Sequence, residues 1–282
     1  MSIIFFGNTK YSTIIAKKLH QHIGLTAIVT LPDRLIGRKQ VLTPTPTKIL
    51  AEQYNIPVIT AEKLTDEVIT KISTFHPDFL IVADYRLFLP DQLLKIPQLA
   101  AINVHHSLLP KYRGPSPAPA AILAGDTVTG VTIIKMTNEV DAGDMLTQKE
   151  YSLQQNETTD SLLSQLNKIG AEILLPVLHD YQNYNQHAKQ QNQKLVTFTT
   201  HMSKQDGFID LDHPPTPQSF DRMIRAYYPW PNVWTIVKMK NKEVRIKFFP
   251  EEKIQIEGKN LVMKEEFYRG YPELKDKLEK LY

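Results

Sequence analysis

The sequence contains no cysteine among its 282 residues, which excludes disulfide bonds and thiolate metal sites. It also lacks any apolar run long enough to span a bilayer. Met1 and Ser2 lead directly into an apolar segment, without the pattern of a secretion signal. These absences are compatible with a reducing compartment. We therefore expect a cytoplasmic protein with no membrane partner.

A large excess of one charge is also absent, since 33 Lys and Arg residues face 30 Asp and Glu residues, for a formal charge of +3. Such a small excess permits an anionic partner without requiring one. Hydrophobic residues make up 42% of the chain. That fraction and this length allow a sizeable core, in one large domain or in two smaller ones.

The first part of the chain alternates short apolar segments with segments of helical periodicity. Strand patterns occur at residues 3–7, 25–31, 57–60, 78–83, 100–105, 129–136 and 145–153. Helical patterns occur at residues 11–22, 48–52, 65–75 and 159–181. Apolar strands that alternate with helices predict an α/β fold, in which helices cover both faces of an open, mostly parallel sheet.

The composition changes between residues 183 and 194, where Asn, Gln, His and Lys replace almost all apolar residues. This segment is typical of a solvated linker. Beyond it, residues 217–228 indicate a helix, and residues 233–239 and 243–249 alternate around Lys240-Asn241-Lys242 as a hairpin does. Short strands are expected at 254–256 and 261–263. We therefore predict a catalytic domain at 1–182, a linker at 183–204 and a small β-rich domain at 205–282.

Polar side chains gather at the carboxyl end of the strand that begins at Ala100. Successive side chains of a strand point to opposite faces, so Asn103, His105 and Ser107 share one face and His106 points to the other. A second polar cluster, Asp141-Ala142-Gly143-Asp144, follows in a later loop. An amide, an imidazole, a hydroxyl and an acid are the groups that polarise a carbonyl and move a proton.

A single strand histidine is most often structural, but His105 lies at the edge of the sheet where open α/β folds bind ligands. We therefore favour a catalytic role for it. A metal site built from His105, His106, Asp141 and Asp144 is the weaker reading, because adjacent strand histidines diverge. We expect no metal.

Two basic segments are candidates for phosphate contacts. The long connection at residues 31–46 contains several prolines and carries Arg34, Arg38 and Lys39. The later hairpin carries one acidic residue, Glu243, and five basic residues, namely Lys238, Lys240, Lys242, Arg245 and Lys247. Most such runs are simply solvated, but long ordered loops at an active edge are often functional. Both segments could follow a nucleic-acid backbone.

Several motifs, in order through nearly the entire chain, resemble those of the formyltetrahydrofolate-dependent formyltransferases. The motifs are Pro32-Asp33-Arg34, Gly37-Arg38-Lys39, Leu42-Thr43-Pro44-Thr45-Pro46, Asn103-Val104-His105, Ser107-Leu108-Leu109-Pro110, Tyr112-Arg113-Gly114, Gly130-Val131-Thr132-Ile133, Asp141-Ala142-Gly143-Asp144 and Ile224-Arg225-Ala226-Tyr227-Tyr228-Pro229-Trp230-Pro231. The resemblance implies a Rossmann-like N-terminal domain that performs the chemistry. It also implies a small C-terminal β-barrel (OB-like) domain that helps to hold tRNA.

The resemblance further implies a role for each matching residue. The catalytic set would be Asn103, His105 and Asp141. The cofactor-binding residues would be Ser107, Leu108, Leu109, Pro110, Tyr85, Leu87 and Asp144. The tRNA-binding residues would be Arg34, Arg38, Lys39, Lys238, Lys240, Lys242 and Arg245. A monomer would then transfer the formyl group of 10-formyltetrahydrofolate, without a metal, to the α-amine of methionine on charged initiator tRNA.

The chain departs from the family pattern at two places beside the expected folate pocket. His106 stands where the family usually has glycine, and Ala83-Asp84-Tyr85-Arg86-Leu87 stands where it commonly has a smaller Tyr-Gly element. Three other functions stay open. A sugar-nucleotide N-formyltransferase would share the catalytic residues, and a formyltetrahydrofolate hydrolase would share the donor. A non-catalytic RNA-binding protein would explain the basic segments but not the catalytic set.

Overall fold

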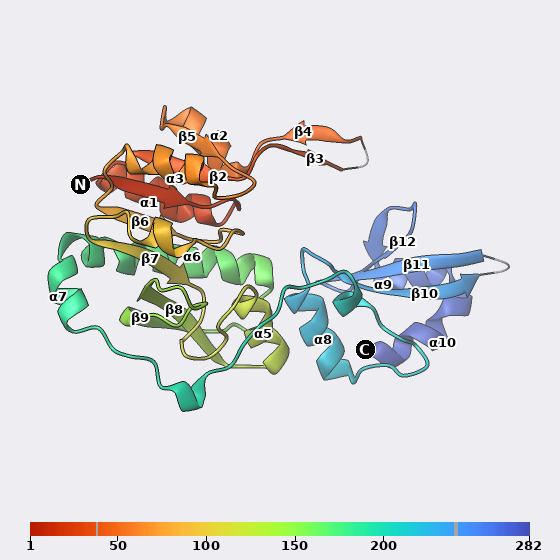
Figure 1. The fold of residues 1–282 in the computed structure, drawn as a ribbon. Coiled ribbons are helices and arrows are strands. Elements are labelled where there is room, and N and C mark those ends of the chain that lie inside the picture. Colours follow the sequence, from red (N-terminus) through yellow and green to blue (C-terminus); the bar gives the residue numbers. More distant parts are fainter. Residues whose placement is uncertain (38, 240–241) are drawn as a thin grey trace. The chain divides into compact units, whose positions relative to one another are not determined.

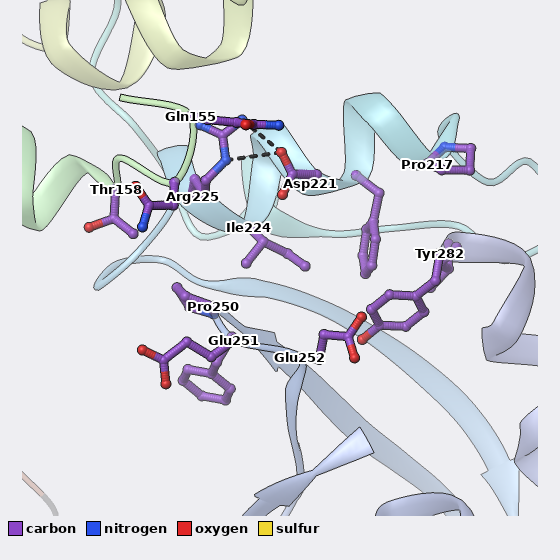
Figure 2. A pocket seen from close by; sticks show the side chains of 14 residues that line it. Gln155, Thr158, Pro217, Asp221, Ile224, Arg225, Pro250, Glu251, Glu252 and Tyr282 are labelled. Atoms are coloured by element: carbon purple, nitrogen blue, oxygen red, sulfur yellow. Dashed lines mark hydrogen bonds and ion pairs between the residues drawn. The ribbon is translucent and has the colours of Figure 1, made fainter. Parts of the chain in front are cut away.

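The computed structural model describes residues 1–37, 39–239 and 242–282. Arg38 and Lys240, both predicted to bind tRNA, lie outside these ranges. The described residues form two compact units (Figure 1). Unit 1 comprises Met1–Arg113, Gly130–Tyr151 and Leu163–Phe198, and unit 2 comprises Gly114–Thr129, Ser152–Leu162 and Thr199–Tyr282. Each unit combines segments that are separate in the sequence. The domain boundaries that we predict at 182 and 205 therefore stay a prediction.

A seven-stranded sheet in the order β5-β2-β1-β6-β7-β8-β9 forms the centre of unit 1. Its strands are β1 (Ile3–Phe6), β2 (Ala27–Thr30), β5 (Val58–Thr60), β6 (Phe79–Val82), β7 (Ala100–His105), β8 (Val128–Lys135) and β9 (Met145–Ser152). The first five in this order pair in parallel, and β8 runs antiparallel to β7. Every residue of β1, β2 and β6 is buried, as expected for a sheet covered on both faces. The predicted mostly parallel α/β fold is confirmed.

Helices pack on both faces of this sheet. They are α1 (Ser12–His22), α2 (Pro46–Gln53), α3 (Asp66–Ser73), α4 (Asp91–Leu94), α6 (Thr159–His179) and α7 (Tyr181–Gln186). On one face, Ile72 of α3 and Leu93 of α4 share a core with Ala101 of β7. On the other face, α6 approaches β7 so closely that a Cβ at Gly170 would lie 2.6 Å from Val104 Cγ1. A glycine at this helical position therefore sets the distance between α6 and the strand that carries the predicted site.

The basic connection at residues 31–46 folds into an antiparallel hairpin, β3 (Arg34–Ile36) and β4 (Val41–Thr43), where we expected an irregular loop. In Figure 1 it extends away from the sheet of unit 1. An ion pair of 2.8 Å between Lys48 Nζ and Asp33 Oδ1 fastens its base to α2. This contact helps to raise the pKa of Lys48, chiefly through the hydrogen bond to Asp33.

Unit 2 is rich in β-structure, as predicted. Its four-stranded antiparallel sheet consists of β10 (Val233–Met239), β11 (Lys242–Phe249), β12 (Lys253–Ile256) and β13 (Leu261–Met263). Its helices are α5 (Pro117–Ala124), α8 (Pro217–Ala226), α9 (Lys264–Gly270) and α10 (Lys275–Leu278), and α5 packs against α8. Phe220, Val233, Ile246, Phe248 and Phe267 are central residues of its core.

Short 3-10 helices complete the chain at Gln193–Leu195, Gln205–Gly207, Pro272–Leu274 and Glu279–Leu281. Within the three described ranges, no helix combines the length and the apolar character that crossing a membrane requires.

Candidate active site

Asn103, His105 and Asp141 meet at the carboxyl end of β7. The Asn103 amide donates to Asp141 Oδ1 at 3.0 Å, and His105 Nδ1 lies 3.4 Å from Asp141 Oδ2. Asn103 and His105 alternate along β7, while Asp141 comes from the loop between β8 and β9 with a backbone φ of +49°. The structure thus brings together the three residues that the sequence pointed to.

The contacts of His105 place each of its ring nitrogens beside an acceptor. Its Nε2 lies 2.9 Å from the Tyr112 carbonyl oxygen, which can only accept, so Nε2 carries a hydrogen. Its Nδ1 faces the Asp141 carboxylate, which also accepts and is already bonded by the Asn103 amide. The ring is only 5% exposed, so its contacts with Tyr112 and Asp141 are shielded from water.

A glycine and a glutamine hold the Asp141 loop in place. A Cβ at Gly143 would overlap the Lys135 carbonyl oxygen, so only glycine allows the loop to lie this close to β8. Gln191 Nε2 donates to the carbonyls of Asp141 and Gly143 at 2.7 and 2.9 Å, and Gln191 Oε1 accepts from Arg113 Nε at 2.9 Å. Gln191 is buried although it belongs to the segment that we predicted to be a solvated linker. No signal in that polar run distinguishes Gln191 from its neighbours.

The segment after β7 forms a tight turn that uses its own polar groups. The Ser107 hydroxyl donates to the Lys111 carbonyl at 2.6 Å. Thr132 of β8 donates to the Ser107 carbonyl at 2.7 Å and accepts from the Leu109 amide at 3.1 Å. Because β7 ends at His105, Ser107 lies in this turn rather than on the strand face that the alternation predicted.

The other predicted folate residues lie in different surroundings. The Tyr85 ring meets Phe6 edge-on with centroids 5.4 Å apart. Its hydroxyl is buried without a hydrogen-bond partner among the described residues, and burial raises its pKa. Leu87 is half-buried. Asp144 is exposed, and its carbonyl accepts from the Lys135 amide at 3.0 Å.

The residue after His105 belongs to a second histidine–aspartate pair. His106 Nδ1 is 3.3 Å from Asp84 Oδ1, and Asp84 Oδ2 accepts from Asn167 Nδ2 at 3.2 Å and from Thr9 Oγ1 at 3.3 Å. Burial by itself would raise the pKa of Asp84. The charge of His106 and the hydrogen bonds from His106, Asn167 and Thr9 together hold this pKa below its usual value.

The predicted tRNA-binding residues that the structure describes divide between the two units. In unit 1, Arg34 and Lys39 are exposed on or beside the β3–β4 hairpin. In unit 2, Lys238 and Lys242 are exposed, and the Arg245 guanidinium lies 4.8 Å from the centre of the Trp234 ring. Among the described residues, no three His, Asp or Glu side chains are grouped so as to hold a metal ion.

Comparison with known proteins identifies the family. Residues 1–178 match the model of the formyl transferase family. The methionyl-tRNA formyltransferase of Listeria welshimeri is 36% identical over 262 residues, which cover 93% of this chain and 83% of that protein.

Two solved structures show the same fold. A sugar N-formyltransferase from a Shewanella species has a TM-score of 0.65 at 18% identity, covering 89% of this chain and 98% of that one. HypX from Aquifex aeolicus, in complex with tetrahydrofolic acid, has a TM-score of 0.60 at 16% identity, covering 88% of this chain and 37% of that one. The family match and the similarity along most of the chain show that this protein belongs to the formyl transferase family.

Proposed function

We propose that this enzyme transfers the formyl group of 10-formyltetrahydrofolate to the α-amine of methionine esterified to initiator tRNA. The observation that carries the proposal is the convergence of Asn103, His105 and Asp141 at one point, within contacts of 3.0 and 3.4 Å. The convergence supplies hydrogen-bond donors, a buried imidazole and a carboxylate together, as attack of an amine on a formyl carbon requires.

In this reaction the amine nitrogen bonds to the formyl carbon, and the bond from that carbon to N10 of the folate then breaks. The Asn103 amide has two N–H groups, of which one donates to Asp141, so the other is available to the formyl oxygen. The His105 imidazole stabilises the negative charge that develops on this oxygen. Asp141 takes the proton of the attacking amine, directly or through water, and N10 gains a proton as tetrahydrofolate leaves.

The donor would lie beside β7, against Ser107 to Pro110 and the Tyr85 and Leu87 side chains, with Asp144 at the exposed rim. The unpartnered Tyr85 hydroxyl supports this placement, because a buried polar group without a partner is costly unless a ligand satisfies it. Tyr85 packs in the same core as Ala101, on the face of β7 that carries Asn103. The tetrahydrofolic acid bound to HypX is consistent with a folate in this fold.

The similarity to a methionyl-tRNA formyltransferase favours charged tRNA over an amino sugar as the acceptor. That similarity is 36% identity over 93% of the chain, whereas the sugar N-formyltransferase shares 18% and therefore indicates the fold alone. We further propose that the enzyme acts as a monomer in the cytoplasm.

The proposal is tested by a formyl-transfer assay with labelled 10-formyltetrahydrofolate and three alternative acceptors. Charged initiator tRNA should accept the formyl group, while an amino-sugar nucleotide should not, and free formate should not appear when no acceptor is added. Transfer to the sugar nucleotide alone would establish the second candidate function, and rapid release of formate without an acceptor would establish a hydrolase.

Replacing Arg34 and Lys39 together by alanine should weaken the use of charged tRNA without changing the affinity for folate. Both side chains are exposed, on or beside the β3–β4 hairpin, where phosphates could reach them. Each lost phosphate contact should reduce the slope of log affinity against log salt by about 0.9. The measurement is tRNA binding as a function of salt, beside folate titration.

The matched control replaces Lys17 and Lys71, which are exposed on α1 and α3. This control removes the same charge from elsewhere in unit 1, so its salt slope should stay at the wild-type value. Equal loss of tRNA and folate binding in the Arg34 and Lys39 variant would contradict the assignment of these residues to tRNA.

A further inference from the structure

We propose that His106 and Asp84 form a positioning pair, which holds the end of β7, and with it Asn103 and His105, in the geometry of the reaction. The inference rests on the proposed function in so far as Asn103 and His105 are its reacting groups. His106 and Asp84 themselves are positioning residues, because they act through the backbone of β7 and not by contact with the substrate.

The pair lies on the opposite side of β7 from the reacting groups. Val104 of β7 points to the face opposite Asn103 and His105, and it packs on Gly170 of α6. Asn167, three residues before Gly170 on the same face of α6, donates to Asp84, the partner of His106. His106 therefore faces α6, whereas Asn103 and His105 face the Asp141 loop.

The Asp84 carboxylate joins four segments of unit 1. Asp84 itself follows β6, Thr9 follows β1, His106 follows β7 and Asn167 belongs to α6. The three partners approach its two oxygens at 3.2 to 3.3 Å. One carboxylate thus ties together the ends of three strands at the edge of the sheet where the chemistry occurs.

Asp84 occupies this place at a cost in backbone conformation. Its φ of +46° lies in the left-handed region, which a residue other than glycine adopts only when its surroundings hold it there. Both side chains are also withdrawn from water, since those of His106 and Asp84 are 5% and 14% exposed. Desolvation offsets much of the attraction between buried polar groups, so stability alone does not account for the pair. The pair instead holds the ends of β1, β6 and β7 in one defined arrangement.

The arrangement matters to the reaction because His105 and His106 share a peptide bond. A shift of His106 away from Asp84 would move the His105 backbone, and with it the contacts to Asp141 and to the Tyr112 carbonyl. Misplacement of a reacting group by about 1 Å lowers turnover by about 10²-fold without an equal loss of binding. The expected signature of the pair is therefore a fall in kcat with little change in KM.

The test compares His106→Ala/Asp84→Ala with the wild type, using the acceptor that the wild type formylates in the three-acceptor assay. If the proposed acceptor is wrong, the three-acceptor assay of the wild type shows it. If the positioning role is wrong, the kcat of the double variant shows it. Removing both side chains leaves no lone buried carboxylate, so we expect a folded protein with wild-type circular dichroism. Its kcat should fall at least about tenfold, while KM for donor and acceptor changes less than about twofold.

A conservative variant and a control complete the experiment. His106→Asn keeps an N–H for Asp84, so its kcat should exceed that of His106→Ala at least about fivefold. His213→Ala removes the other histidine of a histidine–aspartate pair, exposed in unit 2 at 3.0 Å from Asp210, and should leave kcat unchanged. Wild-type kcat in the folded double variant would overturn the proposal. If the double variant does not fold, the two single variants decide. The proposal is overturned if His106→Asn and His106→Ala have the same kcat when equal amounts of folded protein are compared.

Discussion

His105→Ala should lower kcat for formyl transfer by about 10²–10³-fold while leaving the affinity for folate largely unchanged. The substitution removes the buried imidazole that faces Asp141 and lies beside the expected position of the oxyanion. This group is stabilising chiefly in the transition state, because the formyl oxygen gains its negative charge only as the amine attacks. Single-turnover transfer with saturating donor, beside fluorescence titration of folate, separates the two quantities.

A matched control is available within unit 1. His22 is exposed near the end of α1, where its Nδ1 contacts the Lys18 carbonyl at 2.9 Å, and His22→Ala should keep wild-type turnover. Turnover near the wild-type level in folded His105→Ala would show that the site around His105 has been wrongly assigned. A parallel fall in folate affinity would place His105 in the donor pocket rather than in the chemical step.

Most of the fold of unit 1 could be predicted because its strands are short, continuous apolar runs. Ile3 to Phe6 and Phe79 to Val82 are buried along their whole length, and burial on both faces leaves a clear pattern in the sequence. The β3–β4 hairpin was harder to predict from the sequence. Leu35, Ile36, Val41 and Leu42 are all more than half exposed, so no buried face marks it as sheet structure. Its charged and glycine residues are typical of a loop.

The candidate site could be predicted only in part, because some of its residues come from segments that are far apart along the chain. Asn103 and His105 lie on one strand, so alternation alone places them on one face. The approach of Asp141 depends on how the loop after β8 packs, so the sequence offered the cluster at 141–144 as the source of an acid but not its distance from β7. Gln191 and the His106–Asp84 pair depend on contacts between segments far apart in sequence. Such contacts have no local pattern.

The conformation of the Asp141 loop suggests a second large effect, at a residue that has no reactive group. Gly143 lies against β8, where a Cβ would overlap the Lys135 carbonyl oxygen. That carbonyl belongs to the backbone, so it cannot move aside as the end of a flexible side chain can. The loop itself must therefore shift to accept a larger residue. Its displacement would also lengthen the hydrogen bonds from Gln191 to the Asp141 and Gly143 carbonyls.

Gly143→Ala should therefore lower kcat by about 10²-fold, since Asp141 would move by about 1 Å from His105 and Asn103. Overpacking of this kind should also reduce the free energy of unfolding by about 1–3 kcal/mol. Gly270→Ala is the control, because no atom lies within 4 Å of a Cβ built there and its backbone requires no special φ. Thermal melting and single-turnover transfer of both variants provide the check. Wild-type kcat in Gly143→Ala would mean that the loop tolerates the shift and that the position of Asp141 does not limit the reaction.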